Sequence, residues 1–176
     1  MRDLIGEAIG FGFSHAGLLD VSTLVPRDEV RAMCAADRCG AYGCSWVCPP
    51  GCGTLDHSRE VIGRYHSGLI VQTTAELEDS FDYEAMMTAN DLQSELVADF
   101  RDVLSPDYPG MVALGNGACK LCPVCTYPDD PCRYPDRAIS SMEAFGLVVS
   151  DVCSSNNLPY YYGPDTITYT GCYLLA

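Results

Sequence analysis

The most regular hydrophobic pattern in the chain lies over residues 83–104, where apolar side chains recur every three or four positions. The positions that form this stripe are Ala89, Leu92, Leu96, Phe100 and Val103. Asp79, Asp82 and Glu84 crowd the start of the segment, where a helix dipole favours acids, and Pro106 follows its end. The pattern predicts one long amphipathic helix that buries a single face.

Shorter patterns predict further elements on both sides of this helix. The predicted helices cover residues 2–10, 26–33 and 56–66, and the predicted strands cover residues 15–21, 67–74, 110–116 and 166–176. The letters "SSME" have the form of a capping box, which predicts another helix that begins at Ser141 and is interrupted at Gly146. These elements predict an α+β fold, with one compact domain over residues 1–176. We expect a small mixed sheet, flanking helices and two cysteine-rich cofactor-binding loops.

The first of these loops to consider holds Cys119, Cys122, Cys125 and Cys132, which have the form Cys-x2-Cys-x2-Cys-x6-Cys. A zinc ion needs four ligands around one atom, and proteins usually supply them as two separated Cys-x2-Cys pairs. A cubane cluster needs each thiolate on a different iron, and successive spacings of three suit that arrangement. The spacing therefore favours a [4Fe-4S] cluster, with zinc as the alternative.

A second cysteine-rich segment lies earlier in the chain and holds five thiols. These are Cys34, Cys39, Cys44, Cys48 and Cys52. Five thiols exceed the four that one cluster or one zinc ion uses, so one of them is surplus, and the spacing does not identify it. We predict a second metal centre here, with Cys34, Cys39, Cys44 and Cys48 as candidate ligands and [4Fe-4S] again the expected cofactor. Cys44, Cys48 and Cys52 follow one another at the first interval of the radical-SAM motif Cys-x3-Cys-x2-Cys. No cysteine follows at the second interval, so we reject that motif.

The remaining candidates have simpler explanations. His57 follows Cys52 closely but is expected to be an exposed residue at a helix start. Cys153 and Cys172 lie in apolar patterns and are expected to be small buried hydrophobic residues. A tyrosine-rich segment over residues 160–173 suits either a substrate pocket, a redox interface or ordinary packing on a sheet.

Charge and cysteine usage limit the partners and the compartment. The chain has 24 acids against 10 bases, and its net charge of −14 argues against nucleic acid or an anionic membrane as a partner. A basic redox protein fits the charge better. Eleven cysteines without a signal peptide or an apolar span predict a soluble, cytoplasmic protein with reduced thiols.

Four stretches together resemble a known family. They are "CGAYGCSWVCPP", "GACKLCPVC", "PCRYPDRAISSMEAFGL" and the closing "ITYTGCYLL". They are similar to a family of cysteine-rich proteins of anaerobic bacteria and archaea that is described as predicted metal-binding. The resemblance implies metal ligands at Cys39, Cys48, Cys119, Cys122, Cys125 and Cys132. It leaves open the roles of Cys34, Cys44 and Cys52, and it implies no particular activity.

Three functions are compatible with these observations. The first is an iron–sulfur protein that carries electrons, or serves as a redox subunit, in anaerobic metabolism. The second is a structural or regulatory module in which zinc holds the loops in place. The third, with less support, is a small iron–sulfur enzyme whose first cluster keeps an open iron beside the tyrosine-rich strand. Whether the protein is an enzyme stays open on the sequence.

Overall fold

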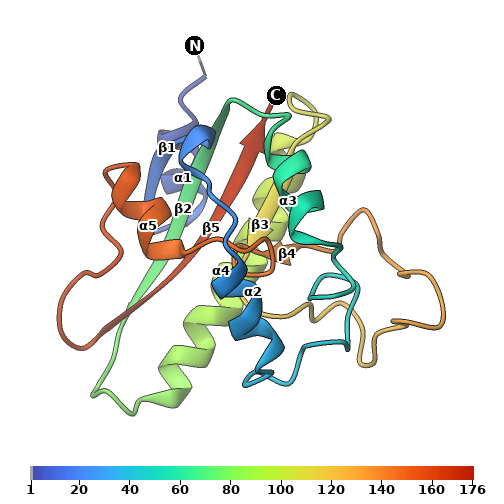
Figure 1. The fold of residues 1–176 in the computed structure, drawn as a ribbon. Helices are drawn as coiled ribbons and strands as arrows, with labels where there is room; N and C mark the ends of the chain where they lie inside the picture. Colours follow the sequence, from blue (N-terminus) through green and yellow to red (C-terminus); the bar gives the residue numbers. More distant parts are fainter. Residues whose placement is uncertain (1) are drawn as a thin grey trace.

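A computed structural model describes residues 2–176, which form one α+β domain around a mixed, open sheet of five strands (Figure 1). The strands are β1 (His15–Asp20), β2 (Ser67–Glu76), β3 (Val112–Gly115), β4 (Ser140–Ser141) and β5 (Thr166–Leu175). Their order across the sheet is β1-β2-β5-β3-β4. Only the β3–β4 pair is parallel, and the other neighbours are antiparallel. The predicted fold class is confirmed.

Five α-helices accompany the sheet within the described residues. They are α1 (Leu4–Phe11), α2 (Asp28–Ala35), α3 (Leu55–Ile62), α4 (Tyr83–Leu104) and α5 (Val149–Ser155), and a 3-10 turn, Val21–Thr23, follows β1. Side-chain oxygens of Asp3, Thr54 and Asp82 cap the starts of α1, α3 and α4 by accepting backbone N–H bonds. These caps explain why three helices begin where the sequence predicts, to within two residues.

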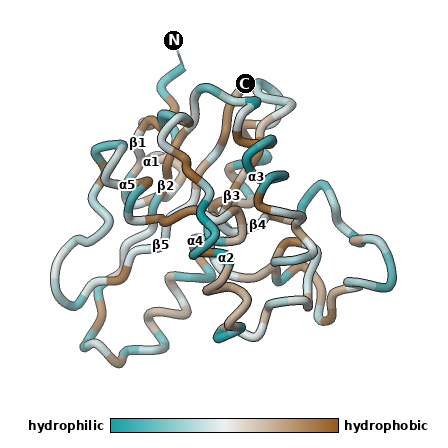
Figure 2. Tube along the Cα trace, viewed as in Figure 1, coloured by the Kyte–Doolittle hydropathy of each residue, from teal (hydrophilic) through white to brown (hydrophobic). Residues whose placement is uncertain are grey.

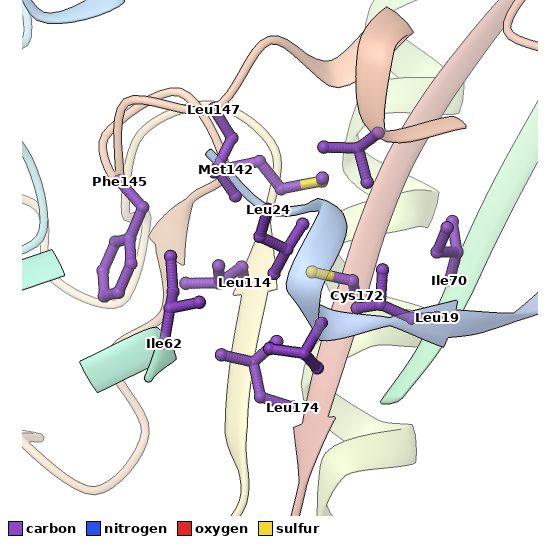
Figure 3. Close-up of a cluster of buried hydrophobic side chains, with 12 residues drawn as sticks. Leu19, Leu24, Ile62, Ile70, Leu114, Met142, Phe145, Leu147, Cys172 and Leu174 are labelled. Carbon is purple, nitrogen blue, oxygen red and sulfur yellow. The ribbon is translucent and has the colours of Figure 1, made fainter. Parts of the chain in front are cut away.

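Both faces of the sheet are buried because the central strands alternate apolar side chains between them. Ile70, Cys172 and Leu174 point to the face that α3 and α5 cover, and Figure 3 shows this cluster. Leu69 and Tyr173 point to the opposite face, which is covered by α1 and α4. Figure 2 shows apolar residues along the strands and hydrophilic residues in parts of α2 and α3.

Helix α4 has the predicted bounds, but the face it buries differs from the prediction by about one residue. Ala89 and Phe100 are buried as predicted, whereas Leu92 and Val103 are each 44% exposed. Gln93 is buried instead, because its amide oxygen accepts a hydrogen bond from Thr73 at 2.6 Å. A polar residue with a buried partner thus displaces an apolar one from the contact face.

One predicted helix is absent, and another begins two residues later than predicted. Helix α2 begins at Asp28 rather than Pro26, because the backbone of Arg27 is extended and its N–H donates to Gly146 O at 2.8 Å. No helix begins at Ser141, which lies in β4. Its hydroxyl accepts the N–H of Ala144 at 3.0 Å, but the turn ends at Gly146, whose φ is +80°. The capping motif therefore closes a single turn, and that turn becomes part of the cysteine-rich region.

Candidate metal centre

The thiols of Cys119, Cys122, Cys125 and Cys132 border one cavity of about 190 Å³. All four side chains are half-buried, so each thiol is accessible from the cavity without being fully exposed. The loop that carries them connects β3 to β4 and extends from the β4 side of the sheet (Figure 1). The structure thus brings the four cysteines of the later group to one cavity.

Side chain–backbone bonds fold this loop around the cavity. Thr126 donates its hydroxyl to the carbonyl of Pro131 at 2.9 Å, and the Arg133 guanidinium donates to the carbonyl of Val124 at 2.9 Å. These bonds close the segment between Cys125 and Cys132, whose chain separation would otherwise leave them apart. The guanidinium of Arg133 is thereby held against the loop, on a residue that is exposed to solvent.

Charge and burial act differently on the thiols of this group. Backbone N–H donation from Tyr127, supported by Trp46, lowers the pKa of Cys125. Burial raises the pKa of Cys119, and the neighbouring thiols raise it further. Because the thiolate is the form that binds a metal, the lowered pKa of Cys125 favours its role as a ligand.

The two cysteine-rich loops contact each other at Trp46. Its indole Nε1 donates to the carbonyl of Asp130 at 3.1 Å, and its ring packs edge-to-face on Tyr127 with centroids 4.9 Å apart. Cys44, two residues before Trp46, lines the same cavity as the later cysteine group. One member of the earlier group therefore faces the later one.

Two other thiols of the earlier group, those of Cys34 and Cys52, lie against the turn that follows β4. Cys34, in the last turn of α2, donates to the carbonyl of Glu143 at 3.9 Å. Cys52 donates to the next carbonyl, that of Ala144, at 3.7 Å. Cys48 precedes Cys52 by one helical turn, in which the Cys52 N–H donates to Cys48 O at 3.0 Å.

Burial is the main influence on the thiols of this region. It raises the pKa of Cys48 to about 11, while a hydrogen bond with Ser45 acts in the opposite direction. It also raises the pKa of Cys34, where the charge of Glu143 adds to the effect. The thiol of Cys39, which is exposed, contributes to the raised pKa of both Cys34 and Cys48. The raised pKa of Cys34 and of Cys48 disfavours their thiolate forms, which a bound cation would stabilise.

Neither group forms a closed site for a single ion. Within residues 2–176, no three Cys, His, Asp or Glu side chains are arranged around one point so that they would hold a metal ion. The donor set nevertheless fits a thiophilic metal, because thiols are the predominant ligand type around the cavity and soft metals prefer thiolate.

The other sequence candidates lie outside the two cysteine groups, although the His57 ring lies beside Gly53, which follows Cys52. His57 is exposed in the first turn of α3, and Cys153 and Cys172 are fully buried, all as predicted. Tyr162 stacks on His15 of β1, at the sheet edge opposite β4, with ring centroids 4.0 Å apart. Tyr173 is buried and donates its hydroxyl to Val97 O of α4 at 2.9 Å, which is packing rather than a pocket.

Two residues that the sequence analysis did not single out belong to this region. Trp46 joins the loops, and Arg31 lies one helical turn before Cys34 on α2. The Arg31 guanidinium donates to Gly53 O at 3.0 Å and to Ser58 Oγ at 3.2 Å, which ties α2 to the start of α3. The spacing of three between Arg31 and Cys34 is the signal that could have identified it, because such residues share a helix face.

An α+β domain that carries two neighbouring groups of reduced cysteines on the loops beside one sheet edge defines a cysteine-rich protein equipped for metal binding. The comparison with protein families agrees, since the model of a family described as Predicted metal-binding protein (DUF2284) matches residues 17–175. The chain belongs to this family. Neither the curated proteins nor the solved structures contain a significant match. Among residues 2–176, no helix combines the length and the apolar character that crossing a membrane requires.

Proposed function

We propose that Cys119, Cys122, Cys125 and Cys132 bind a [4Fe-4S] cluster and that the protein passes single electrons to or from a redox partner. The observation that carries the proposal is that these four thiols border one cavity. When bound, such a cluster would supply a one-electron redox couple, and the partner would donate or accept the electron. The protein's part is to supply four thiolates and to hold the loop around them.

Two features support a cluster over a single zinc ion. Cys119, Cys122 and Cys125 follow one another at spacings of three, which suits thiolates that bind different irons. The cavity of about 190 Å³ is also larger than one ion needs, because a single water molecule fits in about 10–15 Å³.

The charge of the protein supports a basic partner. The net charge of −14 would steer a positively charged protein toward this one. The loop itself carries as many bases as acids, namely Lys120, Arg133 and Arg137 against Asp129, Asp130 and Asp136. Long-range attraction would therefore come from the rest of the surface, while the loop would make a contact that is balanced in charge.

The cluster proposal is tested on protein purified without oxygen, by measuring iron, acid-labile sulfide and zinc and by recording the EPR spectrum after reduction. We expect iron and sulfide in equal amounts and a reversible one-electron signal. Cys122→Ala should lose the iron and sulfide of this group. Full metal occupancy in that variant would overturn the ligand assignment. Zinc without sulfide would favour the structural module instead.

A structural zinc module is the second candidate, and the makeup of the loop favours it. Between Gly115 and Ser140 the described chain has no helix or strand, and side chain–backbone bonds hold it together. A metal would supply stability that such a loop lacks. A colourless, redox-silent protein that loses the loop's protection from proteolysis upon chelation would establish this role.

The partner proposal has a separate test in the salt dependence of association with a basic redox protein. The Debye length falls from about 10 Å at 0.1 M salt to a few Å at about 0.5 M. Association should therefore slow markedly over this range. Equal rates throughout would remove the basic partner and leave the cluster proposal unaffected.

A further inference from the structure

The five cysteines between residues 34 and 52 do not face one space. Cys44 lines the cavity of the later cysteine group, together with Trp46. Cys34 and Cys52 instead donate to the adjacent carbonyls of Glu143 and Ala144, on the turn after β4. Two thiols that are 18 positions apart in the chain therefore contact successive carbonyls of one turn. The positions of the thiols in the fold therefore divide the five cysteines into two sets, a division that their spacing in the sequence does not reveal.

Cys48 and Cys39 complete the group around these two sulfurs. Cys48 is buried and joined to Cys52 through one helical turn, so both thiols belong to the same short segment. Cys39 lies in the loop between α2 and Cys44, where Gly40 and Gly43 adopt positive φ. The charge of its thiolate form would raise the pKa of both Cys34 and Cys48, which supports its inclusion in the group.

Arg31 supplies an independent sign that this region is built for an anionic ligand set. Two of its guanidinium nitrogens are satisfied by Gly53 O and Ser58 Oγ. Its Nε is buried and has no hydrogen-bond partner among the described residues. A buried donor without an acceptor is costly, whereas a thiolate would provide both an acceptor and an opposite charge. Burial raises the pKa of Cys52, and the charge of Arg31 opposes that effect, so the two side chains are neighbours.

We infer that Cys34, Cys39, Cys48 and Cys52 form a metal centre separate from the one at Cys119–Cys132, with Arg31 as a positioning residue for the thiolates. Cys44 is not part of this centre. The ligand is a thiophilic metal, either zinc or an iron–sulfur cluster, because four thiolates suit both. Binding releases the thiol protons to solvent, and the charge of Arg31 offsets part of the negative charge that four thiolates retain around the metal.

This inference does not depend on the proposed electron transfer, and cobalt(II) can test it because Co²⁺ reports thiolate ligands by its absorption. The protein used is the full chain with Cys122→Ala, which removes a ligand of the later group. In this background we expect one Co²⁺ per chain, with intense sulfur-to-metal charge-transfer absorption in the near ultraviolet. Adding Cys52→Ser should abolish that absorption or weaken Co²⁺ affinity by at least about tenfold, whereas adding Cys44→Ser should leave both unchanged.

Arg31 is tested in the same background with Arg31→Gln, which removes the charge and the Nε donor. We expect Co²⁺ affinity to fall by roughly 10–100-fold while the charge-transfer spectrum keeps its shape, as is typical when a residue outside the ligand set is lost. Arg31→Lys restores the charge without the Nε–H and should recover part of the affinity. Unchanged affinity in both variants would overturn the role of Arg31.

Equal loss in Cys44→Ser and Cys52→Ser would overturn the division of the thiols, and so would loss in Cys44→Ser alone. If Cys122→Ala fails to fold, the two serine variants are compared in the otherwise unchanged chain by metal and sulfide analysis. Cys52→Ser should then lose the metal of one centre and Cys44→Ser should keep it. Iron with sulfide identifies a cluster at this centre, and zinc without sulfide identifies a single ion. Neither result depends on whether the other centre carries electrons.

Discussion

The indole of Trp46 donates a hydrogen bond to the backbone carbonyl of Asp130 at 3.1 Å, and 84 positions of chain separate the two residues. This bond joins the two cysteine-rich loops, which otherwise extend from the sheet without regular secondary structure. Trp46 lies in the chain between Cys44, which lines the cavity of the later cysteine group, and Cys48, which is buried and accepts the backbone N–H of Cys52 in the earlier group. The two candidate centres are therefore neighbours that share one short segment of chain.

Trp46→Phe should loosen this junction, because it removes the indole donor and keeps an aromatic ring against Tyr127. We expect a loss of about 0.5–1.5 kcal/mol in the free energy of unfolding, measured by urea denaturation. Tyr42→Phe is the matched control in the same loop, since that side chain is exposed and makes no described hydrogen bond. A variant as stable as the parent protein would mean that the bond contributes nothing to the junction.

The buried cysteines should behave as core residues and not as ligands. Cys172→Ser places a hydroxyl in a fully apolar cluster and should cost about 1–3 kcal/mol. Cys153→Ser should cost less, because Gln72 Nε2 lies 3.5 Å from the sulfur and Thr170 Oγ1 lies 4.0 Å from it. The metal content should be unchanged in both variants. Loss of iron or zinc from either variant would show that the cysteine it replaces is a metal ligand and not only a core residue.

Gly146→Ala should destabilise the turn that both Cys34 and Cys52 contact. The φ of Gly146 is +80°, and a Cβ there would collide with Leu55 and crowd the backbone of Arg27. We expect a loss of about 1–3 kcal/mol in unfolding free energy, together with weaker metal binding at the earlier cysteine group. Gly10→Ala serves as the control, because its Cβ would meet nothing within 4 Å and should stabilise α1 by about 0.5–1 kcal/mol.

The stabilisation that Asp82 gives to the start of α4 should depend on pH. Backbone N–H donation from Glu78 and Ala85 lowers the pKa of this carboxyl. Because the folded pKa lies below the unfolded value of about 3.9, the stabilisation is complete above that value and is lost as pH falls through the folded pKa. Asp82→Ala should therefore lower Tm at pH 7, and the difference from the parent protein should shrink below about pH 4. A difference that is constant with pH would exclude the charged cap.

The same residues show how far the sequence predicts the structure. Asp82 and Pro106 bound α4 through local chemistry, so its ends were predictable. The burial of Gln93 in place of Leu92 depends on Thr73, a residue on another element, and no local pattern contains that information. The capping motif at Ser141 was misleading for a similar reason, because a glycine at positive φ ends the turn after a few residues.

For the cysteines as well, local spacing predicts one part of the arrangement, and contacts between distant residues decide the rest. The clustering of Cys119, Cys122 and Cys125 follows from spacing alone, and the structure places all three on one cavity. The separation of Cys44 from Cys52 could not be predicted, because it depends on Trp46 reaching Asp130 and on the turn after β4. Arg31 shares a helix face with Cys34, yet its unpaired Nε becomes evident only when α3 packs beside it.

Strand β5 lies in the middle of the sheet, between β2 and β3, although it follows both cysteine-rich loops in the chain. During synthesis from the N-terminus, both loops would therefore leave the ribosome before the sheet that supports them can assemble. The thiols would be exposed to oxidation and to stray metals during that interval. A metal that needs the thiols in their final positions would then bind after β5 has paired.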